Sequence, residues 1–174
     1  MANYKIDAAH SEIKFQVRHM MITNVTGNFL QFDATMESEK SDFSDAKIQF
    51  EADVNSITTN QEQRDNHLKS ADFFDAANHP KLTFASTKIE SKGSNEFALY
   101  GDITMRGVTK RVVLNVEYGG TATDGYGQVK SGFEISGKVN RKDFGLNWSS
   151  LTEAGGLVVS DDVKLVLQVQ MIKQ

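Results

Sequence analysis

Hydrophobic and polar residues alternate along most of this chain. Between positions 46 and 54, Ala46, Ile48, Phe50, Ala52 and Val54 fall on one face, and the residues between them are charged or polar. Successive side chains of a strand point to opposite faces, so this pattern predicts a β-strand with one apolar face. Similar patterns, some shorter or less regular, occur at 13–17, 25–36, 82–84, 97–103, 112–118, 129–139 and 163–171. About eight such strands predict an all-β sandwich or barrel.

One segment breaks the alternation. Residues 60–68 read NQEQRDNHL, contain good helix formers, and begin with Asn60, an N-cap type of residue followed three positions later by Gln63. We predict a short helix over residues 60–75 that continues through Phe73 and Phe74. Polar or glycine-rich stretches at 91–95 and 119–127 predict turns. The length and the absence of an internal repeat predict a single domain over residues 1–174.

The charge balance argues against nucleic acid as a partner. The chain has 19 Lys and Arg against 23 Asp and Glu, a net charge of −4, and no basic cluster. Nucleic-acid binders and proteins that adsorb to anionic membranes usually carry such a cluster. No stretch approaches the roughly 18 apolar residues of a membrane helix, and the first seven residues contain no apolar signal-peptide core. We therefore expect a cytoplasmic protein without stable membrane insertion, or a periplasmic one if a leader precedes this sequence. A homodimer is one assembly compatible with the sequence.

Catalytic and metal-binding motifs are missing. There is no cysteine, which excludes thiol catalysis and thiolate metal sites. The four histidines, at positions 10, 19, 67 and 79, show neither HxH nor HExxH spacing, and no GxSxG motif occurs. We expect no metal, no cofactor and no enzymatic activity. A Ser-His-Asp triad assembled only in space stays open, so a hydrolase or isomerase that uses His19 or His67 on an apolar substrate is the alternative.

Three polar residues have positions that allow a functional reading. His19 follows Ile13, Phe15 and Val17 at period two and so ends an apolar face. It is either a polar group at the end of an apolar cavity or a buried histidine bonded to the backbone. Arg64 and His67 lie at i and i+3 on the predicted helix and share a face. They either face a ligand or form a solvated surface pair.

The apolar strand faces predict the lining of an interior. Gly101, Ser131 and Gly137 occupy inward positions where a filled core would favour larger side chains. They either relieve crowding inside a narrow barrel or leave space for a ligand. The residues that we expect to line this interior are Phe15, Phe50, Phe84, Leu99, Phe133 and Leu165.

Five segments together resemble the YceI-like family. They are spread over most of the chain and are 7–11 with 15–19, 64–68, 72–75 with 79–80, 101–109 and 141–145. The resemblance implies an extended, antiparallel, lipocalin-like barrel that holds a long isoprenoid or a similar amphiphile. It also implies links to polyprenyl lipids, isoprenoid quinones and stress responses, and it supplies no catalytic residues.

The implied ligand has one polar end, which must stay hydrated or find hydrogen-bond partners. We expect the helix to act as a lid near Phe73 and Phe74, with Arg64 and His67 contacting or screening the head group and His19 as a third contact. An arginine can bind phosphate or carboxyl oxygens with two donors, and a histidine can donate to a quinone carbonyl. Carriage, storage and stress protection are all compatible with this ligand. A fully packed barrel that serves as a protein-interaction module is the remaining alternative.

Overall fold

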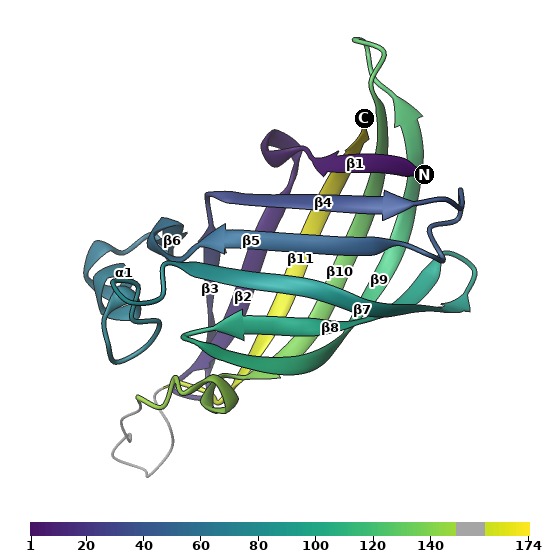
Figure 1. Cartoon of the computed structure of the whole chain (residues 1–174). Coiled ribbons are helices and arrows are strands. Elements are labelled where there is room, and N and C mark those ends of the chain that lie inside the picture. The colour runs from purple at the N-terminus through teal and green to yellow at the C-terminus, as the bar shows by residue number, and fades with distance from the viewer. Residues whose placement is uncertain (149–158) are drawn as a thin grey trace.

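The computed structural model describes residues 1–148 and 159–174, and in these residues eleven β-strands form one antiparallel sheet (Figure 1). One α-helix, α1 (Glu62–Lys69), and 3₁₀ turns at 8–10, 54–56 and 141–144 complete the regular structure of this part. The strands are β1 (Ala2–Ile6), β2 (Glu12–His19), β3 (Thr23–Phe29), β4 (Phe32–Ser38), β5 (Lys47–Asp53), β6 (Ile57–Thr58), β7 (Lys81–Gly93), β8 (Glu96–Met105), β9 (Val108–Thr123), β10 (Val129–Asn140) and β11 (Asp162–Lys173).

Eight of these strands close into a barrel. Their order is β1-β4-β5-β7-β8-β9-β10-β11, and β1 returns to β11 through pairs such as Ile6 with Met171. The other half of β11 pairs with β2, and β3 and β6 extend the sheet from there. In Figure 1, β4, β5, β7 and β8 form the near wall and cross steeply over β9, β10 and β11 behind them. The antiparallel barrel of about eight strands predicted from the sequence is thus confirmed.

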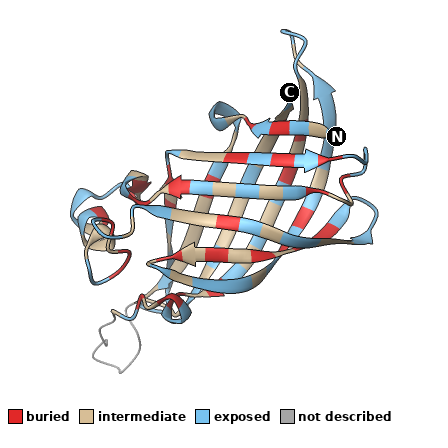
Figure 2. Ribbon diagram, in the orientation of Figure 1, coloured by how far each residue is buried: buried red, intermediate tan, exposed pale blue. Residues whose placement is uncertain are grey.

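The apolar and polar residues that alternate in the sequence are alternately buried and exposed in the structure. On β4, Ala34, Met36 and Ser38 are buried, whereas Thr35 and Glu37 between them are exposed. Buried and exposed positions alternate visibly along the near wall in Figure 2. The buried side chains point into the barrel, so the apolar core of this fold is the barrel interior.

The helix is shorter than predicted. It spans Glu62–Lys69, and Phe73 and Phe74 lie in the turns that follow it. Asn60 is not the N-cap: it has a positive φ of 62°, and Gln61 precedes the helix without a side-chain cap. The C-terminal end has a clear cause, because Ser70 is extended and its hydroxyl donates to the His67 carbonyl at 2.6 Å.

The irregular pattern at 25–36 is two strands, not one. β3 ends at Phe29 and β4 begins at Phe32. Backbone bonds stabilise the bend between them, because the Leu30 amide donates to Ser56 and the Asp53 amide donates to Gln31. The inward positions are odd-numbered up to Phe29 and even-numbered from Phe32 onward, so the period-two pattern changes phase at this bend. This change of phase is the sequence signal that separates the two strands.

The small inward residues relieve crowding. A Cβ at Gly101 would lie 2.4 Å from the Phe84 ring, and one at Gly137 would lie 2.5 Å from Leu114. Buried Ser131 instead forms a hydrogen bond with Thr121 at 2.8 Å. Of the two readings of the glycines, the one that left their space to a ligand is therefore wrong.

Candidate functional site

The barrel contains an internal cavity of about 150 Å³. Twenty-six of its 27 lining residues are apolar, and the exception is Lys14, whose ammonium pairs with Glu12 at 2.8 Å. A cavity that offers water no polar partners stays dry. At about 24 cal/mol per Å³, such a void would destabilise the empty barrel by roughly 3–4 kcal/mol. An apolar ligand that fills the cavity would recover this cost.

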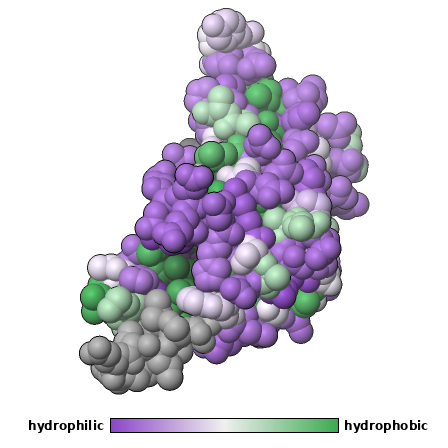
Figure 3. Space-filling view, turned by 90° about the vertical axis from the view of Figure 1, so that its left-hand side faces the viewer, coloured by the Kyte–Doolittle hydropathy of each residue, from purple (hydrophilic) through white to green (hydrophobic). Residues whose placement is uncertain are grey.

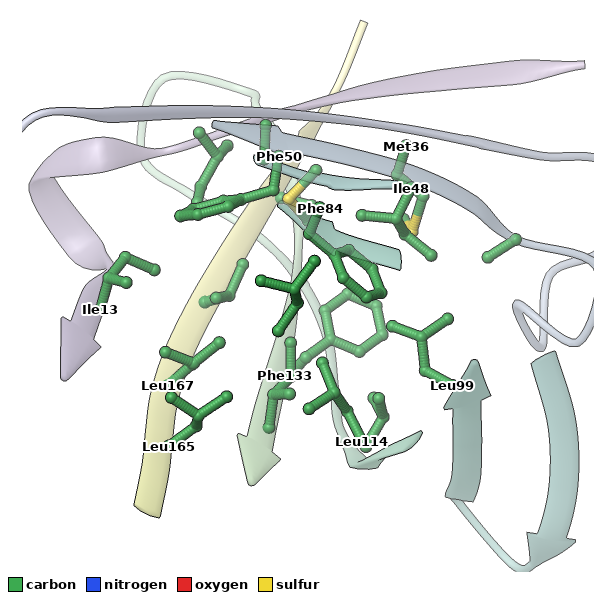
Figure 4. Close-up of a pocket in the computed structure, with 18 of the residues that line it drawn as sticks. Ile13, Met36, Ile48, Phe50, Phe84, Leu99, Leu114, Phe133, Leu165 and Leu167 are labelled. Carbon is green, nitrogen blue, oxygen red and sulfur yellow. The ribbon is translucent and has the colours of Figure 1, made fainter. Parts of the chain in front are cut away.

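All six residues predicted to line the interior belong to the lining of this cavity. Phe50 and Phe84 come from the near wall, Phe133 and Leu165 from the far wall, and their side chains converge on one space (Figure 4). The remaining two, Phe15 and Leu99, lie on β2 and β8. Their contact with a ligand remains a prediction.

Aromatic residues close one end of the barrel. Phe43, from the loop between β4 and β5, is 4% exposed and packs edge-on against three rings. These rings belong to Tyr4, Tyr118 and Phe133, with centroid distances of 5.6, 5.3 and 5.3 Å. Such an edge-to-face cluster is a favourable aromatic arrangement. This cluster therefore covers the end of the cavity next to the loop between β4 and β5.

A second cavity, of about 270 Å³, lies at the opposite end and forms the mouth. It adjoins the internal cavity, because six residues line both: Phe15, Phe29, Leu82, Met105, Val139 and Leu165. The ends of β2, β10 and β11, together with β3, α1 and the turns after α1, surround it. Figure 3 views the molecule from the α1 side and shows apolar surface hollowed between hydrophilic residues.

The ionisable side chains that line the mouth are all basic. Arg18, Arg64 and Arg141 line it together with His19 and His67, and no carboxylate belongs to its described lining. The fold brings Arg64 and His67 from α1 and His19 from β2 to one cavity, and their contact with a head group stays a prediction. The arrangement favours an anion or a hydrogen-bond acceptor at the mouth.

Arg64 is held by a neutral partner. Its Nε donates to the Thr59 hydroxyl at 2.7 Å and its Nη2 to the Thr59 carbonyl at 2.8 Å. Thr59 in turn donates its amide and its hydroxyl to buried Asp65, at 2.8 and 2.5 Å. Among the described residues, Arg64 forms no ion pair. The guanidinium is therefore oriented by Thr59 without a direct carboxylate contact, and Asp65 lies one hydroxyl away from it.

His67 is less available than predicted. Its Nε2 lies 2.9 Å from Asp72, and its ring packs edge-on against Trp148 at 4.7 Å and Phe73 at 5.1 Å. Only Nδ1 is left to meet a head group. His67 thus belongs to an aromatic wall of the mouth, together with Phe73 and Trp148, whose rings lie 5.4 Å apart.

Arg141 is a mouth residue that sequence reasoning missed as a site. It is 4% exposed, and its guanidinium donates to the carbonyls of Leu146, Trp148 and Ser160 at 2.6–2.9 Å. Burial lowers the pKa of this guanidinium, and Asp161 partly compensates. Because its donors bind backbone, Arg141 fixes the rim of the mouth. No periodic pattern predicts an arginine buried by loop carbonyls.

In the part of the chain that the structure describes, no cluster of three or more His, Asp or Glu side chains is arranged to hold a metal ion. Within the same residues, no helix is both long enough and apolar enough to cross a membrane.

Comparison with known proteins gives a consistent picture. A family model described as the YceI-like domain matches residues 4–171. A UPF0312 protein of Staphylococcus aureus is 38% identical over 165 residues, which cover 94% of each chain. The crystal structure of the Campylobacter jejuni YCEI protein matches with a TM-score of 0.77 and 32% identity over 90% of both chains.

Two more distant structures show the same fold. Burkholderia cenocepacia BcnA matches with a TM-score of 0.83 and 21% identity, over 95% of this chain and 98% of that one. A structure described as a polyisoprenoid binding domain from Saccharophagus degradans matches with a TM-score of 0.71 and 16% identity, over 98% of both chains. At these identities, the likeness concerns the fold alone.

Proposed function

This chain belongs to the YceI-like family, and from that premise we propose that its barrel binds one long apolar amphiphile with an anionic or hydrogen-bond-accepting head group. One observation carries the proposal: a dry apolar cavity, closed at one end, continues into a mouth lined by arginine and histidine. Polyprenyl phosphates and isoprenoid quinones have this shape and polarity. The description of the Saccharophagus degradans domain as polyisoprenoid binding points in the same direction.

The length of the lining limits the buried part of the ligand. Val163 lines the mouth, and Met171, eight residues further along β11, lines the internal cavity. At about 3.4 Å per residue, this run measures roughly 27 Å. An extended chain advances roughly 1.2 Å per bond, so the four bonds of an isoprene unit advance about 5 Å. About five units then fit in extended form, and a longer chain has to bend or leave its end outside.

We propose binding without turnover. Thr59 supplies the one hydroxyl of the described mouth lining, and it donates its proton to Asp65 rather than to a histidine. Arg64 also donates to this hydroxyl, and no mouth histidine among the described residues is hydrogen-bonded to it, so the hydroxyl–histidine pair of a serine-hydrolase-like site is not formed there. The packed-module alternative is disfavoured by the internal cavity, because a fully packed barrel has no reason to keep a void.

The test is a comparison of a charged and an uncharged ligand. Geranylgeranyl phosphate and geranylgeraniol are titrated against the protein, and the fluorescence of Trp148, the one tryptophan of the chain, reports binding at the mouth. Arg64→Ala should weaken the phosphate by about 1.5–3 kcal/mol, the range for a hydrogen bond to a charged group, and leave the alcohol nearly unchanged. Arg111→Ala is the matched control, because Arg111 pairs with Asp102 on the exposed surface of β9 and should change neither ligand.

Two results would contradict this assignment. Equal losses for both ligands in Arg64→Ala would mean that Arg64 maintains the mouth instead of binding the head group. No loss for either ligand would place the head group elsewhere. Native mass spectrometry of the purified protein, before any ligand is added, supplies a second test, because a carrier should retain a lipid mass.

A further inference from the structure

The turn between β2 and β3 exposes three consecutive large apolar side chains. Met20, Met21 and Ile22 are 44%, 60% and 71% exposed. Single exposed apolar residues, such as Tyr126 elsewhere on this protein, are normal for a soluble surface. A contiguous group of three at the tip of a hairpin is not, and such groups mark contact surfaces.

The residues at the centre of this turn are unfavourable for its backbone conformation. The Ile22 amide donates to the His19 carbonyl at 3.1 Å, and the two central residues, Met20 and Met21, have φ values of 53° and 64°. Two successive positive φ angles are typical of a type I′ turn, which strongly favours Asn-Gly. Methionine has a Cβ that makes the left-handed conformation unfavourable. A local sequence that opposes its own fold is expected where function requires it.

The base of this hairpin forms one wall of the mouth. Val17, Arg18, His19 and Val25 all line it, and Figure 1 shows β2 and β3 descending to the end of the barrel where the chain leaves β10. Arg18 is exposed and donates from Nη2 to the Met21 carbonyl at 2.8 Å. In the described part of the chain, Arg18 forms no ion pair. An apolar tip, an exposed arginine and the opening of an apolar cavity therefore lie together.

We infer that the Met20–Ile22 tip docks the protein reversibly on a lipid bilayer that carries anionic head groups. The three side chains enter the boundary between head groups and acyl chains, while Arg18 and Arg64 face the anionic lipids. This inference rests on the proposed function, because its purpose is to bring the mouth against the bilayer so that an apolar ligand passes without crossing water. The net charge of −4 opposes adsorption through the rest of the surface.

The experiment measures partition onto vesicles of phosphatidylcholine and phosphatidylglycerol by flotation. Ile22→Ser, and the pair Met20→Asn with Met21→Gly, should each lower partition about tenfold or more, because burying one such side chain is worth at least that factor. Tyr126→Ser is the matched control: it removes an exposed ring, 94% exposed, from the turn between β9 and β10 and should leave partition unchanged.

Thermal unfolding separates docking from a structural role of the turn. The Asn-Gly variant has the residues that the backbone favours, so its Tm should rise by about 2–4 °C while vesicle binding falls. A higher Tm together with weaker vesicle binding in this variant supports the inference. Unchanged partition in the tip variants, absence of wild-type partition, or a lower Tm in the Asn-Gly variant would each overturn it.

The proposed function can fail independently. Farnesyl phosphate is soluble and short, and its titration against Trp148 fluorescence needs no membrane. The tip variants should bind it as the wild type does. If no variant binds it, the head-group assignment fails, yet the flotation result still decides whether the tip docks on a bilayer.

Discussion

Filling the internal cavity should stabilise the protein and remove its ligand at the same time. Ala34 on β4 is 7% exposed and lines the cavity directly opposite Phe50 on β5. Ala34→Leu adds three carbon atoms to this position. Each buried methylene contributes about 0.8 kcal/mol, which gives an upper limit near 2.4 kcal/mol. The void itself, at about 150 Å³, allows a gain of roughly 3–4 kcal/mol at most.

Part of this gain is lost to strain. The new side chain has to adopt a rotamer beside Phe50, and overpacking typically costs about 1–3 kcal/mol where space is short. We therefore expect a net stabilisation of about 1 kcal/mol, which corresponds to a Tm increase of about 2–4 °C for a chain of this size. The ligand loses at least the same three methylene contacts, so its affinity should fall about tenfold or more.

The assay combines thermal unfolding of the lipid-free protein with titration of geranylgeraniol. Ala122→Leu is the matched control, because it makes the same chemical change at an exposed position of β9. Unchanged ligand affinity in Ala34→Leu would refute the location of the ligand inside the barrel. A lower Tm, both in this variant and in Ala46→Leu, a second cavity-lining alanine, would refute the claim that the interior has free space.

Two further predictions test the interior and the loop that closes the barrel. Phe133→Asp places an unpaired charge at an 8% exposed position of the cavity, so urea unfolding should show a loss of several kcal/mol or no folded protein, and normal stability with retained ligand would contradict the inward orientation. Asp45 accepts hydrogen bonds from the Ser38 hydroxyl and from two backbone amides in the loop between β4 and β5, and these bonds lower the pKa of Asp45 to about 2. The stabilisation from its charge is present above the ordinary pKa near 4 and is lost as the pH falls towards 2. Asp45→Asn should therefore flatten the acid side of the stability–pH curve, and a curve identical to that of the wild type would exclude the loop carboxylate as its cause.

The sequence predicted the barrel because the strands repeat one simple rule. Most inward positions are apolar and most outward positions are polar, so the wall of the barrel can be predicted one strand at a time. Along β7, by contrast, the sequence pattern covers only the first part of the strand. β7 spans Lys81–Gly93, although only Leu82 and Phe84 gave a signal, because beyond Phe84 the strand is mostly exposed and lacks a consistent apolar face.

The mouth was predicted only in part, because its residues are distant in sequence. Arg64 and His67 were found together through helical spacing, and His19 through its position after an apolar face. Arg141 and Trp148 come from another part of the chain and meet them only in the fold. Likewise, His67 gave no sign that Asp72 would occupy its Nε2. Side-chain contacts that depend on the geometry of turns produce no periodic pattern in the sequence.

Interior and mouth contribute differently to ligand choice. The interior supplies affinity in proportion to buried area but cannot distinguish head groups, because its described lining offers no free polar atom. Discrimination then depends on the mouth, where one charged hydrogen bond is worth about 1.5–3 kcal/mol, or roughly ten- to a hundred-fold in affinity. The arginines there are not equivalent. Arg141 binds several backbone carbonyls and is needed for the rim, whereas Arg64, among the described residues, is held by Thr59 alone. A substitution at Arg64 can therefore change which head group is accepted while the barrel stays folded.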